Sequence, residues 1–329
     1  MSRKLLPVSI TVALMGGTAI AEVPNVAVDI APIHSLVARV MEGVGTPALI
    51  VTPGASPHEY NLRPSEAAAL QDADLVFWMG EDLTPWMESA VETLADGATV
   101  TSLLDSDGTV LLDFRESALF EAHDHGDEDD HDDHAKEDDD EDEEHADHES
   151  HEDHDDPAHG GHDPHAWLSP ANAEIWLNLI AAQLSSTDPD NAGTYFANAA
   201  AAREEMAALS AEVDQLLEPV RGGNFIVFHD AYQYFEDAFD FPATGAISIG
   251  DATDPSPARI AEIQSRIREE GINCVLAEPQ FNPGIVKTVL EGTEANTSAI
   301  DPLGSDLEPG ADLYPQIIRN MAKTLAECL

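Results

Sequence analysis

Residues 187–218 decide the fold, and their sequence is TDPDNAGTYFANAAAAREEMAALSAEVDQLLE. Asp188 and Pro189 form a helix-start signal, and Pro219 ends the pattern. Between them, apolar residues recur at alternating steps of four and three, which places them on one face of an α-helix. The stretch therefore predicts a single helix of about 28 residues, roughly 40 Å long. The apolar positions are Tyr195, Ala199, Ala202, Met206, Leu209, Val213 and Leu216.

Short apolar runs alternate with helical patterns on both sides of this helix. Such alternation is typical of parallel sheets in α/β proteins. Because the alternation restarts directly after residue 219, we favour a rigid spine between two lobes over a long helix inside one core. The predicted strands are 26–30 (VAVDI), the region near 48–51, 74–78 (DLVFW), 225–228 (FIVF), 273–277 (NCVLA) and 297–300.

The first residues have the features of a secretory signal peptide. Arg3 and Lys4 precede an uncharged, mostly apolar run at 5–20, and a small-residue pattern, AIA, closes it at 19–21. The run is shorter than the roughly 20 residues of a membrane-spanning helix. We therefore expect residues 1–21 to be removed on export.

The remaining chain divides around the long helix. We expect an N-terminal α/β lobe at 22–186, the linking helix at 187–218 and a C-terminal α/β lobe at 219–329. Within the first lobe, residues 121–162 have almost no apolar side chains to offset the entropy of ordering, so we expect a disordered insertion there.

Negative charge dominates the composition. The net charge is −50, which excludes nucleic acid as a partner because phosphate binding needs clustered Lys and Arg. Residues 121–162 contain 22 acids and one lysine, so they carry −21 and the rest of the chain −29.

The insertion is also rich in histidine. Four of its ten histidines recur every third residue, which in an extended chain aligns them on one side, with carboxylates between them. The pattern predicts several weak metal sites; the alternative is a solubilising spacer with incidental affinity. The ten are His123, His125, His131, His134, His145, His148, His151, His154, His159 and His162.

The chain has two cysteines, Cys274 and Cys328. An even pair in an exported chain favours a disulfide over two free thiols. We therefore predict a bridge between the last helix and the second lobe.

Three histidines outside the insertion lie beside prolines or at strand ends. His58 is in the loop after the strand near 48–51, His165 lies in a proline-containing segment, and His229 directly follows the strand at 225–228; Asp301 likewise follows a strand. Ligands of open α/β sheets gather at the carboxyl ends of strands. Neutral imidazoles suit Zn²⁺, so together these residues predict a metal site with one tetrahedral position to fill.

The motifs around these residues resemble those of a known family. SPHEYNLRPS (56–65), DPHAWLSP (163–170), FHDAYQYF (228–235) and AIDPLG (299–304) are similar to the ligand motifs of zinc-specific periplasmic solute-binding proteins of bacterial zinc ABC transporters. The similarity covers essentially the whole chain after residue 21. It implies two lobes, each a four-stranded parallel sheet flanked by helices, joined by one long rigid backbone helix, with metal held between them.

The resemblance also implies the ligand set. The three histidines of the matching motifs bind metal, which carries over to His58, His165 and His229. The fourth position varies in the family between the aspartate of the DPLG motif, a water, and a glutamate preceding the first histidine. Pro57 occupies that preceding place here, so Asp301 or water is expected. Three nitrogens and one oxygen suit zinc, whereas manganese prefers more oxygen ligands, and copper would also tolerate the set. The histidine-rich insertion resembles the loop of the zinc branch.

Two further residues lie near the motifs. Glu59 follows His58, but an adjacent side chain generally points elsewhere. His34 follows the first strand, and a helix-cap or surface position is favoured over an approach to the metal.

We predict a non-enzymatic monomer that captures Zn²⁺ in the periplasm of a Gram-negative bacterium and delivers it to the membrane permease of a zinc ABC transporter. One alternative is a zinc-dependent hydrolase, since three histidines and an open position are also a catalytic arrangement. The sequence has no HExxH helix to support it. A second alternative is a passive periplasmic zinc buffer.

Overall fold

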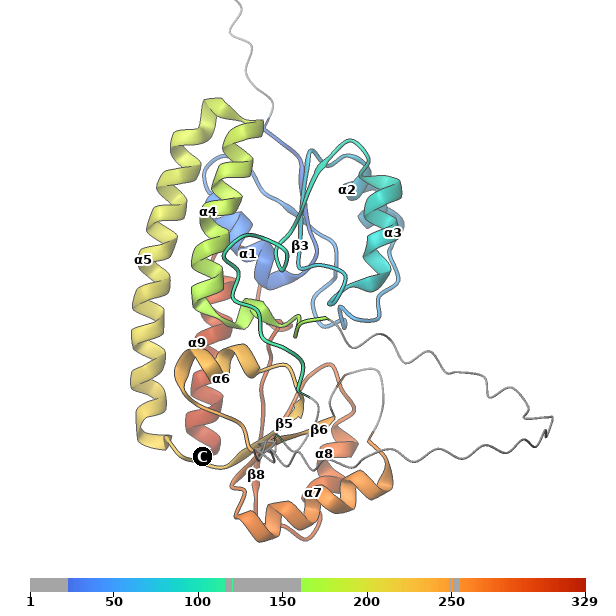
Figure 1. The fold of residues 1–329 in the computed structure, drawn as a ribbon, viewed down its shortest axis with the longest axis vertical. Helices are drawn as coiled ribbons and strands as arrows, with labels where there is room; N and C mark the ends of the chain where they lie inside the picture. Colours follow the sequence, from blue (N-terminus) through green and yellow to red (C-terminus); the bar gives the residue numbers. More distant parts are fainter. Residues whose placement is uncertain (1–22, 116–119, 121–160, 249, 251–254) are drawn as a thin grey trace, which may run out of the picture.

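Two four-stranded parallel sheets lie at opposite ends of an elongated molecule. The computed structural model describes residues 23–115, 120, 161–248, 250 and 255–329. The predicted fold class is confirmed: each sheet is flanked by helices, and a long helix joins the two halves (Figure 1). The predicted signal peptide and nearly all of the predicted insertion lie outside the described residues.

The N-terminal sheet has the strand order β2-β1-β3-β4. Its strands are β1 (Val26–Val28), β2 (Ala48–Leu49), β3 (Leu75–Trp78) and β4 (Thr99–Ser102). The two central strands are buried along their whole length, which explains their apolar sequences. Strand β4 is at the edge and half exposed, so it carries no apolar run and its position was not predicted.

Three helices pack on this sheet. They are α1 (Ala31–Val40), α2 (Pro64–Gln71) and α3 (Pro85–Leu94), and α2 and α3 start with proline at their first position, where no N–H is needed. Helices α2 and α3 cover one face through apolar side chains such as Leu70 and Met87. Helix α1 covers the opposite face and belongs to the main core.

The C-terminal sheet repeats the arrangement in the order β6-β5-β7-β8. Its strands are β5 (Phe225–His229), β6 (Gly245–Ser248), β7 (Cys274–Ala277) and β8 (Asn296–Ala299). Strand β6 was not predicted, because its sequence GAIS has no run of large apolar residues.

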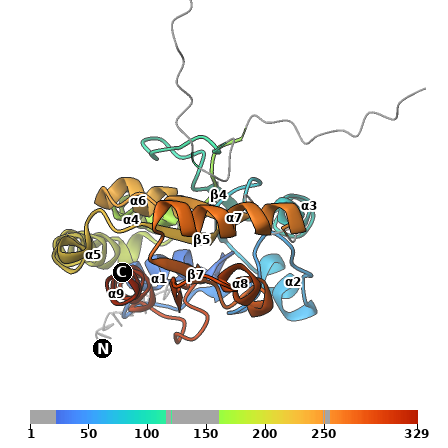
Figure 2. The same ribbon diagram turned by 90° about the horizontal axis from the view of Figure 1, so that it is seen from below.

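Helices cover both faces of this sheet as well. Helices α7 (Pro257–Glu270) and α8 (Pro283–Leu290) pack on one face, and α6 (Gln233–Phe239) follows β5 directly. Seen along the long axis, α3 and α8 lie on one side of the molecule and α5 and α9 on the other (Figure 2).

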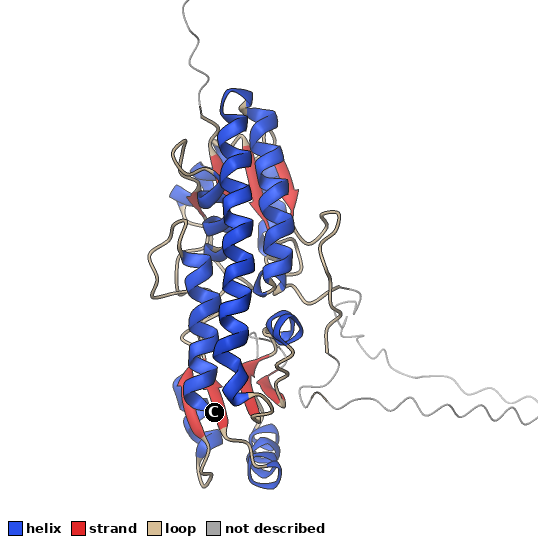
Figure 3. Cartoon of the chain, turned by 90° about the vertical axis from the view of Figure 1, so that its left-hand side faces the viewer, coloured by secondary structure: helices blue, strands red, loops and turns tan. Residues whose placement is uncertain are grey.

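The long helices connect the two sheets. Helix α5 (Ala192–Leu217) packs against α4 (Pro170–Thr187) beside the first sheet and against α9 (Leu313–Cys328) beside the second. Figure 3 shows these helices running along the molecule with one sheet at each end. The predicted helix is thus present, although its first turn is a separate 3-10 helix, Pro189–Asn191.

The buried face of α5 differs from the predicted stripe at one position. Leu217 is fully buried, whereas Leu216 is only partly buried. A helix has 3.6 residues per turn, so a strict alternation of four and three drifts off the buried face over its length. All the other predicted positions are buried.

Cys274 and Cys328 form the predicted disulfide, with their Cα atoms 5.7 Å apart. It joins β7 in the middle of the second sheet to the end of α9. Within the described part of the chain, no helix combines the length and the apolar character needed to cross a membrane.

Candidate metal centre

Three histidines from separate segments meet between the two sheets. His58 lies in the loop after β2, His165 immediately precedes the short helix η1 (Ala166–Leu168), and His229 is the last residue of β5. One ring nitrogen from each lies within 4.8 Å of the others. His165 and His229 are 5% and 6% exposed, and His58 is half-buried. The prediction that these three come together is therefore confirmed as geometry.

A buried carboxylate fixes the orientation of His165. The ring Nδ1 is 2.7 Å from Asp163 Oδ1, and the backbone N–H of His165 donates to the same oxygen at 3.0 Å. An ionised carboxylate only accepts hydrogen bonds, so Nδ1 is the donor and Nε2 is the ring nitrogen that can coordinate a metal. Burial raises the pKa of Asp163 to about 6, while the His165 N–H and the nearby Arg115 charge act to lower it.

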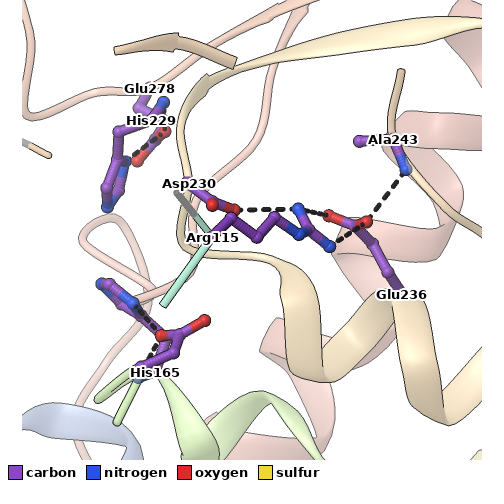
Figure 4. Close-up of polar contacts among 8 residues, drawn as sticks. Arg115, His165, His229, Asp230, Glu236, Ala243 and Glu278 are labelled. Carbon is purple, nitrogen blue, oxygen red and sulfur yellow. Dashed lines mark hydrogen bonds and ion pairs between the residues drawn. The ribbon is translucent and has the colours of Figure 1, made fainter. Parts of the chain in front are cut away.

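His229 has an equivalent partner in the second lobe. Its Nδ1 is 2.7 Å from Glu278 Oε1, and its backbone N–H donates to that oxygen at 3.3 Å (Figure 4). Glu278 directly follows β7, the strand next to β5, and is 4% exposed. Metal-ligating histidines commonly donate their second N–H to such a carboxylate, which fixes the ring and raises its basicity.

The loop of His58 is held by neighbouring side chains. Trp86 Nε1 donates to the Pro57 carbonyl at 2.7 Å, and the His58 backbone N–H donates to Ser56 Oγ at 3.3 Å. The His58 ring lies 5.4 Å from the His165 ring, centroid to centroid. This loop thus places the first histidine against the second.

The three histidines line a small cavity of about 20 Å³. That volume holds about one water-sized group. The walls are partly apolar, with Trp167, Phe281 and Leu303, and partly polar, with Glu278 and Gln280. The cavity suits a compact ion with one small additional ligand.

Asp301 is not part of the histidine group. Its Oδ1 accepts the backbone N–H groups of Leu303 and Gly304, both at 3.0 Å, and its Oδ2 accepts that of Ser305 at 2.6 Å. Among the described residues, the only group of three or more His, Cys, Asp or Glu side chains that could hold a metal is His58, His165 and His229. Both Asp301 oxygens are thus engaged in shaping the loop after β8.

Glu59 is exposed and also lies outside this group. His34 differs from the expected cap or surface position: it is buried inside α1, and its Nε2 lies 3.1 Å from the Pro47 carbonyl. The sequence prediction for His34 was wrong, because α1 packs its first turns into the core.

An arginine ties the first half of the chain to the loop after His229. Arg115 Nη1 is 2.9 Å from Asp230 Oδ1, and Arg115 Nη2 is 2.7 Å from Glu236 Oε2 (Figure 4). Asp230 and Glu236 are both buried. Burial raises the pKa of Asp230 to about 7, and the Arg115 charge opposes that rise. The Phe120 ring lies 3.9 Å from the guanidinium carbon.

Asp163, Glu278 and Arg115 were missed by sequence reasoning. Asp163 had a signal, since it lies two residues before His165 in a quoted motif. Glu278 also had one, because it follows a predicted strand. Arg115 had none, since its partners are more than 100 residues away in the sequence.

Of the histidines predicted in the insertion, the structure describes His162 alone. Its Nδ1 lies 3.0 Å from Asp113 Oδ1, and the two residues form a β-bridge. The other nine lie outside the described residues.

The fold and the site together define a two-lobed metal-binding protein in which histidines from both lobes converge. Comparison with known proteins agrees with that class. Residues 26–328 match the family described as "Zinc-uptake complex component A periplasmic" (ZnuA). The chain belongs to this family.

Relatives resemble this chain over nearly its full length. The High-affinity zinc uptake system protein ZnuA of Brucella abortus (strain 2308) is 48% identical over 314 residues, covering 95% of this chain and 94% of the relative. The protein of the same name from Paracoccus denitrificans (strain Pd 1222) is 48% identical over 328 residues, 98% of each chain. A solved structure, "Crystal structure of ZnuA", has a TM-score of 0.72 at 20% identity and covers 93% of this chain and 99% of its own, which supports the fold.

Proposed function

We propose that this chain captures Zn²⁺ in the periplasm with His58, His165 and His229 and delivers it to the membrane permease of an ABC transporter. The observation that carries the proposal is the convergence of three histidine nitrogens within 4.8 Å of one another. Relatives at 48% identity are named high-affinity zinc uptake system proteins. Removal of residues 1–21 as a signal peptide would place the protein in the periplasm.

The donor set supports zinc over manganese. Three imidazoles converge without a carboxylate among the described residues, and manganese prefers more oxygen ligands. A cavity of about 20 Å³ leaves room for a four-coordinate ion with one water. Because both Asp301 oxygens accept backbone N–H groups, water is our proposed fourth ligand.

Transport is favoured over catalysis by the size of the site. A hydrolase must admit a substrate beside the metal-bound water, and the cavity has room for one small group. We therefore propose that the chain is not an enzyme. The passive-buffer alternative lacks a specific observation in its favour.

The first experiment is a zinc titration of the protein without residues 1–21, followed by calorimetry. The variants His58→Ala, His165→Ala and His229→Ala should each weaken the tight event by orders of magnitude, because each removes a quarter of a tetrahedral shell. His162→Ala is the matched control, since His162 lies outside the group, and it should keep the tight event. Tight binding of wild-type strength in His229→Ala would contradict the site.

Delivery is tested with the permease and its ATPase in proteoliposomes. The zinc-loaded protein should stimulate ATP hydrolysis and zinc uptake, and His229→Ala mixed with the same amount of zinc should not. A protein that binds zinc tightly but stimulates neither activity would be a buffer.

We further propose that the ten histidines at 123–162 hold additional zinc more weakly than the cleft. The segment carries −21, so it should attract cations at low ionic strength. Deleting residues 123–160 should lower the zinc stoichiometry and leave the tight affinity nearly unchanged. Loss of the tight event on deletion would place the primary ligands in the insertion.

A further inference from the structure

The side chain of Gln280 reaches the metal cavity with an unsatisfied acceptor. Gln280 follows β7 and Glu278, and it lines the same small cavity as the three histidines. Its Oε1 is buried, and within the described chain it accepts no hydrogen bond. Buried polar atoms nearly always have a partner, so an orphan acceptor in a ligand cavity points to one.

The other end of the amide is fixed. Gln280 Nε2 donates to Asp301 Oδ1 at 3.3 Å and to Ser305 Oγ at 3.2 Å. Asp301 is itself held by three backbone N–H groups. Because a carboxylate cannot donate, this contact sets which end of the amide faces Asp301 and leaves Oε1 as the end without a protein partner.

We propose that Gln280 Oε1 accepts a hydrogen bond from a water that is the fourth ligand of Zn²⁺, and that Asp301 acts by orienting Gln280. The inference rests on the proposed zinc function and deepens it. A water bound to zinc is a strong donor, since the ion withdraws charge from it. An amide oxygen accepts that bond but takes no proton, so Gln280 would hold the water in place without acting as a general base.

Two other buried polar atoms in the C-terminal lobe lack a hydrogen-bond partner among the described residues, and one can donate while the other can accept. They are Glu278 Oε2 and the Tyr232 hydroxyl. Burial, followed by the Glu278 and Asp301 charges, raises the pKa of Tyr232, so its O–H stays protonated and able to donate to Glu278. Gln280 Oε1 has no comparable donor among the described side chains.

An acceptor at this point also selects the ligand. An amide oxygen favours water, which has protons to donate, and repels an anion, which has none. The site should therefore exclude azide and similar anions from the fourth position for as long as Gln280 is present.

The test uses Co²⁺ in place of Zn²⁺, because cobalt gives a visible spectrum that reports its ligands. In Gln280→Leu, which is similar in size but cannot accept, azide should bind the cobalt at least about tenfold more tightly than in wild type. Zinc affinity, measured against a competing chelator, should fall about tenfold. Gln280→Met is a second apolar variant if the first folds poorly.

Controls separate the alternatives. Gln264 also donates through Nε2, in its case to the Thr288 carbonyl, but it lies on α7 and does not line the metal cavity, so Gln264→Leu should match wild type. If Asp301 were the ligand, Asp301→Asn would change the cobalt spectrum and Gln280→Leu would not. That result, or unchanged azide binding in both apolar variants, would overturn the proposal. Failure of wild type to bind zinc or cobalt would instead overturn the proposed function.

Discussion

Pairs of residues, rather than single histidines, make up much of the candidate metal centre. His165 is paired with Asp163 and His229 with Glu278, each at 2.7 Å, and both carboxylates are buried. The pairing makes Nδ1 of each ring the donor, so Nε2 is the nitrogen that can coordinate an ion. We therefore expect both carboxylates to strengthen zinc binding without contacting the ion.

Replacing Glu278 tests that dependence. Glu278→Gln keeps the shape but removes the charge that favours the Nδ1–H donor, so zinc should bind about 10- to 100-fold more weakly. Competition with a chromophoric chelator measures the change. Glu262→Gln is the control, because Glu262 pairs with Arg259 on the exposed face of α7. Equal losses in both variants would contradict a role specific to the site.

The convergence of the three histidines was predictable from the sequence, and their carboxylate partners were only partly so. His58, His165 and His229 each lie in a local motif, whereas the Glu278 contact joins segments 49 residues apart in the sequence. Such a contact forms because β5 lies beside β7 in the sheet. The sequence pattern indicates where the strands are but not which strands are neighbours. The fourth position remained open between Asp301 and water, because the hydrogen bonds of Asp301 appear only in the folded loop.

At the scale of elements, the apolar spacing in α5 gave the clearest prediction of which side chains are buried. Its apolar stripe was read from spacing, and the one error, Leu216 for Leu217, arose at the end farthest from where the count began. Strands β4 and β6 escaped prediction because an edge strand and a small-residue strand carry little periodic signal.

The two leucines allow a matched test of this packing. Leu217→Ala should destabilise the protein by about 2–5 kcal/mol, since it leaves a cavity in the core, and Leu216→Ala should cost clearly less. Urea unfolding followed by circular dichroism measures both. The reverse order would mean that the helix is rotated relative to the structure.

Helix α1 makes a contact that depends on pH. His34 Nε2 lies 3.1 Å from the Pro47 carbonyl, and burial lowers the pKa of His34. In the unfolded chain a histidine gains its proton near pH 6.5. Protons therefore bind the unfolded state preferentially, and stability falls as pH drops below about 6.5.

The variant His34→Gln should remove this part of the pH dependence. Its amide can still donate to Pro47 but does not titrate. Between about pH 7 and pH 5, wild type should lose more unfolding free energy than the variant, measured by urea melts of the zinc-free proteins. Parallel curves would show that His34 is not the group responsible.

At the scale of the molecule, the two lobes are tied together at the metal centre. The Tyr234 hydroxyl donates to the Asp163 carbonyl and accepts from the Leu112 N–H, and Trp167 Nε1 donates to the Pro302 carbonyl. Arg115 adds the ion pairs to Asp230 and Glu236. These contacts hold His229 against the two histidines of the first lobe.

The ion pairs of Arg115 can be weakened by a substitution that keeps the positive charge. Lysine cannot make the paired bonds of a guanidinium, so Arg115→Lys should loosen the His229 loop and speed zinc release about tenfold. Stopped-flow transfer to a chelator measures the rate. Arg319→Lys is the control, since Arg319 makes a similar two-bond pair with Glu212 away from the site. Identical release rates in wild type and Arg115→Lys would contradict this role.

The contact between α1 and α9 has a consequence for how the chain folds. Ser35 Oγ donates to the Ala311 carbonyl and accepts from the Tyr314 N–H, so the first helix packs on the last across more than 270 residues of sequence. One buried core also runs through both lobes. Contacts between distant parts of a sequence slow folding, because a large loop must close before they form. The first lobe therefore completes its core only after the final helix has been made, and a chain cut short at α5 leaves α1 without its contact to α9.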